Sequence, residues 1–260
     1  WSTDWFRNRE SCIARMEEAI SDALASARQA QPRSEGTVSS EATTAANAPS
    51  VTREQANPRT SVPTGLSIRN YVPASLGVLS RRSSFHELHP SRVAEWLQAV
   101  VNAEAPVQLD LAAKRVTLAY GINRMGGRVK GTINSAVMYG IARGLFQVIE
   151  EKTLVPAVFD LDGVVPRDRS ELGREERHFD YVPGVEVDAA ILMLCAASHG
   201  LSEDEVASAT AQLLGFGRAS AAIREAIERR VVGLAATGKI ERVNIGGDVI
   251  LNLGTVTGGK

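Results

Sequence analysis

Two stretches of the chain carry arginine and lysine side chains at spacings that suit contact with phosphate groups. Each opens with Gly-x-x-Arg and continues in a helical pattern: GINRMGGRVKGTI at 121–133 and GFGRASAAIREAI at 215–227. Residues 121–144 contain four basic and no acidic side chains, and residues 215–239 contain five basic and two acidic ones. The whole chain has a formal net charge of −1, so a nucleic-acid partner has to be argued from these local patches.

The helical pattern predicts which of these side chains face outward. If Val129, Ile133 and Val137 face a core, the residues between them project into solvent. An exposed basic helix fits the major groove of DNA, where its side chains reach phosphates and base edges. We therefore predict a nucleic-acid contact surface formed by Arg128, Lys130, Asn134, Arg143, Arg224, Arg229 and Lys239.

The two Gly-x-x-Arg arginines, Arg124 and Arg218, are predicted to have a structural role. Each lies a few residues before the basic helix, where a guanidinium could pair with a carboxylate of the preceding helix or hold terminal carbonyl groups. The alternative for the basic surface as a whole is a solvated or protein-docking face, because a fold of this kind does not by itself imply DNA contact.

Asp160 and Asp162 point to a different chemistry. The stretch VFDLDGVV at 158–165 resembles the first motif of the haloacid dehalogenase-type phosphatases, which implies a nucleophilic Asp160 and an acid–base Asp162. Such an enzyme also needs a hydroxyl donor, a phosphate-binding lysine and a downstream acidic pair for magnesium. After Asp162 comes the Arg-rich stretch PRDRSELGREERHFDY and then a helical unit, with no apolar strand that ends in Ser or Thr and no acidic pair carried on a strand. A phosphatase is therefore a remote alternative, and this stretch is predicted to be a solvated connector in which Arg167 and Arg169 could contact phosphate.

A repeat at an offset of 94 residues explains why the Gly-x-x-Arg stretch occurs twice. The offset pairs Gly121 with Gly215 and Arg124 with Arg218, and it continues in both directions without a gap. The apolar positions that it matches are Val93 with Val187, Leu97 with Ile191, Val100 with Leu194, Val107 with Leu201, Val129 with Ile223, Ile133 with Ile227, and Val137 with Val231. One hydrophobic template used twice predicts two copies of one structural unit.

Each copy reads as three short helices followed by a β-hairpin. Ser202 can cap a second helix with Glu205 three residues later, and the glycines of both copies suit helix ends. In the second copy, Gly246-Gly247 separates two strand-like segments, KIERVNI and DVILNL. Three helices and a hairpin predict the winged-helix form of helix-turn-helix.

Composition divides the rest of the chain. Residues 29–66 are rich in Ser, Thr, Ala and Pro and contain too few large apolar groups to offset their ordering entropy, which predicts a flexible linker. We predict a mainly α fold with small β-hairpins (α+β). Its parts are a terminal strand and helix at 1–28, the linker at 29–66, a first winged-helix unit at 67–159, a connector at 160–184, a second winged-helix unit at 185–254 and a tail at 255–260.

Several classes of protein are disfavoured by the sequence. The two cysteines, Cys12 and Cys195, lie far apart and outside any C-x-x-C spacing, which disfavours a disulfide scaffold and a zinc module. The longest apolar stretch, VDAAILMLCAA at 187–197, is too short to cross a bilayer. The first residues, WSTDWF, do not have the pattern of a secretion signal, and we expect the chain to be a fragment of a longer protein.

The run EAPVQLDLAAKRVTLAYGINRMGGRVKGTI at 104–133 carries a family resemblance, together with VVPRDRSE downstream and LLGFGRASAAIREAIE in the second copy. It resembles an uncharacterised C-terminal domain of very large bacterial superfamily 1 helicase-like proteins. In those proteins the domain follows a nuclease-like domain that resembles the very-short-patch repair endonucleases, whose last strand often reads like WSTDWF. The resemblance implies that residues 1–28 end that nuclease-like domain. It also implies that the catalytic carboxylates and the motor that binds ATP and Mg²⁺ lie upstream, and that the protein is cytoplasmic in a bacterium.

We therefore expect a non-catalytic, nucleic-acid-binding accessory region of an ATP-dependent helicase with a nuclease-like domain, acting in DNA repair or in defence against foreign DNA. Its expected partners are DNA and its own upstream helicase and nuclease-like domains. We expect no cofactor or metal in this segment, and no membrane partner. The alternative is an interdomain or protein-docking module of the same assembly that makes no direct DNA contact.

Overall fold

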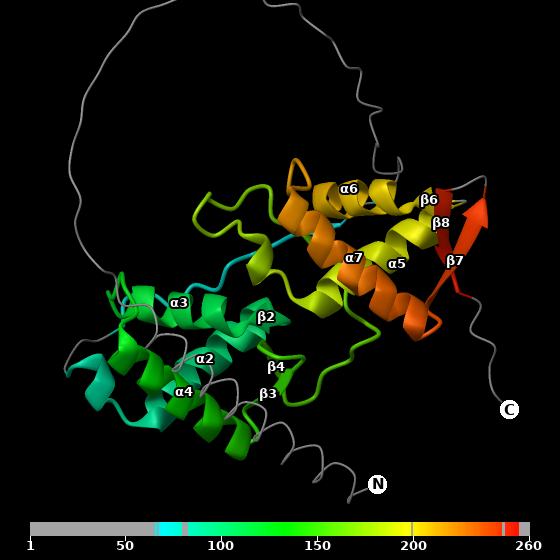
Figure 1. Ribbon diagram of the computed structural model, residues 1–260. Coiled ribbons are helices and arrows are strands. Elements are labelled where there is room, and N and C mark those ends of the chain that lie inside the picture. The colour runs from blue at the N-terminus through cyan, green and yellow to red at the C-terminus, as the bar shows by residue number, and fades with distance from the viewer. Residues whose placement is uncertain (1–65, 67, 80–82, 199, 246–247, 255–260) are drawn as a thin grey trace, which may run out of the picture. The chain divides into compact units, whose positions relative to one another are not determined.

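The computed structural model describes residues 66, 68–79, 83–198, 200–245 and 248–254, all within the unit Pro58–Lys260 (Figure 1). The predicted nuclease-like tail at 1–28 and all of the predicted linker except Leu66 lie outside the described residues. The described part of the chain contains six α-helices and eight short strands. This confirms the predicted α+β class with small β-hairpins.

The first repeat consists of three helices and a small antiparallel sheet. Its elements are α2 (Pro90–Glu104), β2 (Val107–Gln108), α3 (Leu109–Ala119), α4 (Gly127–Ala142), β3 (Phe146–Ile149) and β4 (Thr153–Pro156). Strands β3 and β4 form the predicted hairpin, and β2 pairs with the other edge of β4, with Val107 opposite Leu154. The sheet order is therefore β2-β4-β3.

The second repeat has the same elements in the same order. They are α5 (Gly184–Ala197), β6 (Leu201–Ser202), α6 (Glu203–Leu213), α7 (Ala221–Ala236), β7 (Ile240–Ile245) and β8 (Asp248–Leu253), with sheet order β6-β8-β7. Each element as far as β7 begins 94 residues after its counterpart. The hairpin strands β7 and β8 are longer than β3 and β4, so the constant offset of 94 residues ends after β7. In Figure 1 the helices of the first repeat are green and those of the second are yellow to orange.

The two repeats bury equivalent side chains, which confirms the predicted template. Val93, Leu97 and Val100 of α2 are fully buried, and their counterparts on α5, Val187, Ile191 and Leu194, are at most 3 % exposed. The pairs Ile133 with Ile227, Val137 with Val231, and Phe146 with Ile240 are buried in the same way. Val129 and Ile223, at the start of the third helices, are both half-buried.

Helix ends in both repeats follow from glycine and from one capping box. Gly121 and Gly215 end the second helices with φ of 79° and 87°, values that suit a residue without a Cβ. Gly144 and Gly238 end the third helices in the same left-handed conformation. At the start of α6 the predicted capping box is confirmed, because the Ser202 hydroxyl accepts from the Glu205 N–H and the Glu205 carboxylate accepts from the Ser202 N–H.

The predicted connector holds elements that the sequence pattern did not indicate. Strand β5 (Arg167–Asp168) pairs in parallel with β1 (Arg69–Asn70), and the Tyr71 N–H continues the ladder by donating to the Asp168 carbonyl at 2.7 Å. A single turn of 3-10 helix occurs in the connector at Phe179–Tyr181, and another lies in the first predicted unit at Phe85–Glu87. A strand of two residues is too short to show an alternation of apolar and polar side chains. The sequence therefore did not predict β1, β2, β5 or β6.

Candidate nucleic-acid interface

The third helix of the first repeat, α4, exposes basic side chains that have no acidic partner in the part of the chain that the structure describes. Arg128 and Lys130 are exposed on its first turns, and among the described residues no carboxylate lies within ion-pair distance of either. Asn134 is half-buried. Arg143 is exposed at the end of the helix, where its guanidinium lies 5.4 Å from the centroid of the Tyr139 ring. This helix therefore presents a surface of net positive charge.

The beginning of α4 is open. Its N-cap residue is Gly126, which has no side chain to accept from the first backbone N–H groups, and a Cβ at Gly126 or Gly127 would meet no atom of the described residues within 4 Å. No side chain that the structure describes caps the N–H groups of the first turn, and uncapped N–H groups at a helix N-terminus can bind an anion. The equivalent end of α7 differs, because the Ser220 hydroxyl accepts from the Ile223 N–H at 3.3 Å.

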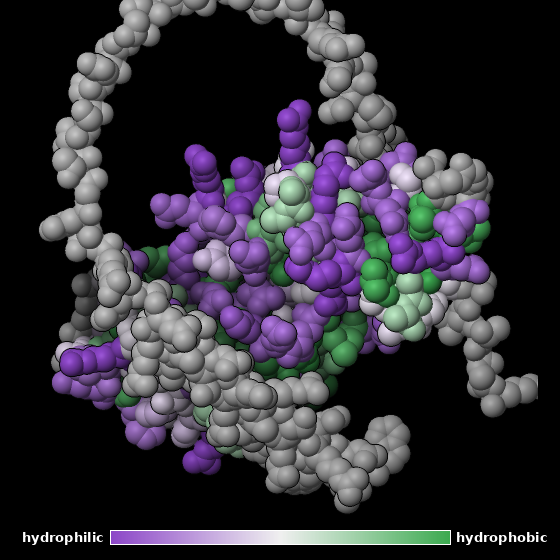
Figure 2. Space-filling model, in the orientation of Figure 1, coloured by the Kyte–Doolittle hydropathy of each residue, from purple (hydrophilic) through white to green (hydrophobic). Residues whose placement is uncertain are grey.

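The predicted cations of α7 are paired with acidic side chains. Arg224 donates to the Asp204 carboxylate at 3.1 Å and to the Ser208 hydroxyl at 3.3 Å. Arg229 lies 3.0 Å from the Glu225 carboxylate, one turn earlier on the same helix. In Figure 2, hydrophilic and apolar side chains both appear over the part of the surface that α7 occupies in Figure 1. Lys239, just before β7, is exposed and forms no ion pair within the described residues.

Arg124 and Arg218 lie at equivalent places between the second and third helices of their repeats. Both are exposed, and neither side chain forms an ion pair or hydrogen bond with any residue that the structure describes. The structural partner that the sequence suggested, a carboxylate of the preceding helix or a terminal carbonyl, is not observed for either arginine.

Arg167 is largely buried and Arg169 is fully buried, so the prediction of solvated side chains that could contact phosphate is wrong for these two arginines, whereas Glu171 and Arg174 of the same connector are exposed. Their side chains are 16 % and 1 % exposed, and both hold the fully buried carboxylate of Glu186 on α5. Two nitrogens of Arg169 donate to the two Glu186 oxygens at 2.8 and 2.7 Å, and Arg167 donates to the same carboxylate at 3.2 and 2.7 Å. These groups form an ion cluster in which Glu186 and Arg169 are fully buried and the Arg167 guanidinium is bound by protein oxygens.

Tyr71 extends this cluster to the first repeat. The guanidinium carbons of Arg167 and Arg169 lie 4.7 and 4.6 Å from the centroid of its ring. Its hydroxyl donates to the buried carboxylate of Glu104 at the end of α2, which also accepts from Arg115 of α3 at 3.0 Å. Burial raises the pKa of the Tyr71 phenol, and the negative charge of Glu104 adds to the effect.

Arg167 also caps the end of α2. Its guanidinium donates to the carbonyl oxygens of Glu104 and Pro106, each at 2.8 Å. One side chain of the connector therefore contacts the backbone of the first repeat and the Glu186 carboxylate of the second. The cluster therefore joins the connector to both repeats by direct contacts.

A signal for the cluster exists in the sequence. Glu104 lies four residues after Val100 and seven after Leu97, on the apolar stripe of its helix, and Glu186 immediately precedes Val187 on the buried face of α5. A carboxylate at such a position requires a buried cation. The connector supplies the cations for Glu186, and Arg115 of α3 supplies the cation for Glu104.

The contribution of Glu186 to stability is expected to depend on pH. Burial alone would raise the pKa of this carboxyl, but hydrogen bonds and charges from Arg169 and Arg167 outweigh it, and the pKa in the folded chain lies below the ordinary value of 4.5. A lowered pKa stabilises the fold above the unfolded value, and that stabilisation is lost as the pH falls through the folded value. Urea unfolding from pH 7 to about pH 3 should therefore show the difference between wild type and Glu186→Gln narrowing below about pH 4.5. A constant difference would contradict this prediction.

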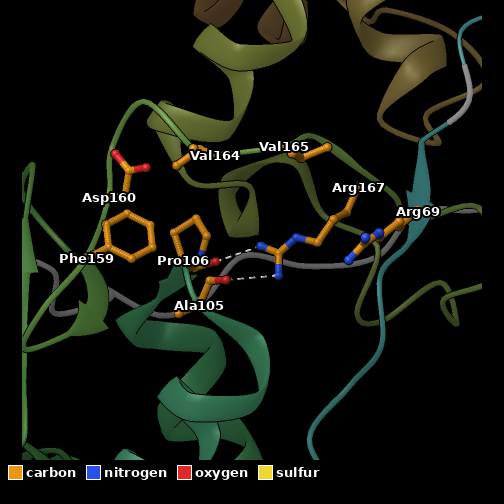
Figure 3. Close-up of a pocket in the computed structure, with 9 residues that line it drawn as sticks. Arg69, Ala105, Pro106, Phe159, Asp160, Val164, Val165 and Arg167 are labelled. Atoms are coloured by element: carbon orange, nitrogen blue, oxygen red, sulfur yellow. Dashed lines mark hydrogen bonds between the residues drawn. The ribbon is translucent and has the colours of Figure 1, made fainter.

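Asp160 lines a small pocket of about 240 Å³ together with Phe159, Pro106, Arg69 and Arg167 (Figure 3). The pocket contains no lysine and no hydroxyl side chain. The Asp160 carboxylate accepts from the Asp162 N–H at 3.1 Å on an exposed loop after β4. Among the described residues, no group of three or more His, Cys, Asp or Glu side chains could hold a metal ion. The structure does not bring phosphatase groups together around these aspartates.

Comparison with known proteins gives one match. A family model described as a protein of unknown function, DUF3320, matches residues 83–131, which include α2, α3 and the first residues of α4. No curated protein and no solved structure shows a significant match. In the described part of the chain, every helix is too short or too polar to span a bilayer.

Proposed function

We propose that this chain is a nucleic-acid-binding accessory region, and that α4 supplies its main contact surface. The observation that carries the proposal is the exposure of Arg128 and Lys130 without an acidic partner among the described residues, beside the open beginning of the same helix. Side-chain cations and free backbone N–H groups are the two kinds of donor that bind phosphate oxygens at a helix N-terminus.

The order of elements supports a winged-helix interpretation of each repeat. Three helices are followed by a hairpin, and a short strand before the second helix completes a three-stranded sheet. In the winged-helix form of helix-turn-helix, the third helix is the one that enters the major groove. On this interpretation α4 is the recognition helix of the first repeat and α7 is its counterpart in the second.

The proposed parent protein is an ATP-dependent helicase with a nuclease-like domain. Support comes from the resemblance to helicase-like proteins, whose central run at 104–133 overlaps the matched family region at 83–131. In this proposal, ATP, Mg²⁺ and the catalytic carboxylates belong to upstream domains of a bacterial cytoplasmic protein. The present region positions DNA for them in repair or in defence against foreign DNA.

The proposal is tested by salt-dependent binding of the 260-residue chain to a DNA duplex of about 20 base pairs. The Arg128→Gln/Lys130→Gln variant is expected to weaken binding roughly tenfold for each phosphate-binding side chain that it removes, at about 0.1 M salt, and to reduce the slope of log K against log salt by about 2. Fluorescence anisotropy measures both quantities. Arg229→Gln is the matched control, because that cation is already paired with Glu225 and its removal should leave the slope unchanged.

A docking module without DNA contact is the second candidate. The loop after β4 favours it, because Val158, Leu161 and Val165 are 93 %, 54 % and 51 % exposed. Apolar side chains exposed close together often mark a protein contact. Absence of duplex binding at about 50 mM salt would contradict the DNA proposal and favour this one.

A further inference from the structure

We infer that Arg124 and Arg218 are a repeated pair of phosphate-contacting residues, one in each repeat, so that the chain binds the nucleic-acid backbone at two equivalent positions. The inference rests on the proposed function. It differs from that proposal by assigning contact residues that α4 does not contain, and by giving the second repeat a contact of its own.

The glycine of each Gly-x-x-Arg stretch has a structural explanation. The Gly121 N–H donates to the Leu118 carbonyl and the Ile122 N–H to the Thr117 carbonyl, both at 2.8 Å, which closes the end of α3 in a Schellman motif. In the second repeat, Gly215 and Phe216 donate in the same way to Gln212 and Ala211. Helix termination therefore accounts for the glycine and for the apolar residue after it, but not for the arginine.

Identical residues at equivalent positions of the repeats otherwise have evident causes. Val93, Ala113, Ile133, Val137 and their counterparts are buried, and the paired glycines have positive φ. Asp110 and Asp204 lie in the first turns of α3 and α6, where an acid is favourable near the helix N-terminus. The remaining shared alanines are exposed, near the ends of helices, where alanine is favoured by propensity alone.

Arg124 and Arg218 are the shared residues that neither packing nor backbone conformation explains. Both are exposed, and no described residue pairs with either side chain. A long charged side chain kept at the same exposed place in two copies that otherwise diverge on their surfaces indicates a shared external contact. Because the group is a guanidinium, an anion is the chemistry that it recognises.

The distribution of free cations supports the same assignment. In the second repeat, Arg224, Arg229 and Arg230 are each paired with an acid, with Arg230 bound to Asp188 and Glu150. Within the described residues 215–239, Arg218 and Lys239 are the cations that remain without an acid. In residues 121–144, all of which the structure describes, the free cations are Arg124, Arg128, Lys130 and Arg143. Position 124/218 is the place at which both repeats offer a free cation.

The test compares Arg124→Gln/Arg218→Gln with wild type in the same duplex titration of the 260-residue chain. We expect roughly tenfold weaker binding for each arginine removed at about 0.1 M salt, and a slope that falls by about 2 in the double variant and by about 1 in each single variant. Arg174→Gln is the matched control, because Arg174 is an exposed cation of the connector that has no counterpart in the other repeat. It should leave the slope unchanged.

The Arg124→Lys/Arg218→Lys variant distinguishes a phosphate-contacting role of the two arginines from a role in stabilising the fold. A lysine retains the point charge, so it should preserve the slope, and thermal unfolding of both double variants should match wild type. An unchanged slope in the glutamine double variant, or a change confined to one arginine, overturns the inference while the proposed function stands. A fall in slope that lysine does not restore and that accompanies lowered stability overturns it as well. If the wild-type chain does not bind duplex even at about 50 mM salt, the proposed function fails and the inference fails with it.

Discussion

The Glu186→Gln variant is expected to unfold with a free energy about 3–5 kcal/mol lower than that of wild type at pH 7. Glutamine has nearly the same shape as glutamate, so the change removes a charge without leaving a cavity. Arg169 is 1 % exposed and Arg167 is 16 % exposed, and the variant takes from both the carboxylate that neutralises them. An arginine side chain does not lose its proton in proteins, so neither guanidinium can escape this penalty by becoming neutral. Urea unfolding followed by circular dichroism measures the difference.

The control for this variant is Glu225→Gln, which breaks a solvent-exposed ion pair in place of a buried one. Glu225 and Arg229 are about 70 % exposed, so water and salt screen their interaction and the expected loss is at most about 1 kcal/mol. Comparable losses in the two variants would show that the Glu186 cluster is solvated. A wild-type-like midpoint for Glu186→Gln would contradict the assignment of this cluster as the contact that holds the connector to both repeats.

The repeat was predictable from the sequence because it is marked by the spacing of apolar residues. Residues such as Leu97 and Ile191 must be buried for the helices to pack, so the same apolar spacing appears in both copies and can be read without a structure. The helix ends at Gly121 and Gly215 could be predicted as well, because a left-handed residue at a helix end is a local requirement of the backbone that glycine meets. Fold class and helix order follow from these two kinds of signal.

Charge pairing was not predictable in the same way. The sequence predicted that Arg224 and Arg229 are free cations of a basic helix. In the structure, Arg224 is paired with Asp204 of the preceding helix. The sequence predicted that Arg169 lies in a solvated stretch. A stretch of mixed charges does not indicate which of its residues is buried. Its partner, Glu186, lies 17 residues later on a different element. Side-chain pairing depends on tertiary placement, so the sequence identified the basic surface without showing which of its cations are free.

The Gly215→Ala variant is expected to lower the free energy of unfolding by about 2–5 kcal/mol, from two separate causes. A φ of 87° is unfavourable for a residue with a Cβ, which costs about 1–2 kcal/mol. The added methyl group would also lie 2.4 Å from the Ser170 nitrogen and 2.6 Å from the Arg169 nitrogen, and the backbone of the connector would have to move to relieve these contacts, at about 1–3 kcal/mol. That movement would disturb Arg169, whose N–H donates to the Leu214 carbonyl at 3.2 Å. Urea unfolding gives the loss directly.

Gly144→Ala isolates the first of these causes. Gly144 also has a positive φ, of 66°, but a Cβ there would meet no atom within 4 Å, so only the backbone cost of about 1–2 kcal/mol is expected. The difference between the two variants measures how closely the connector packs against the end of α6. Because Gly215→Ala displaces the segment that carries Arg169, its effect should overlap with that of Glu186→Gln, and the double variant should be destabilised by less than the sum of the two. Equal losses for Gly215→Ala and Gly144→Ala, or strict additivity with Glu186→Gln, would show that the turn and the buried cluster are independent.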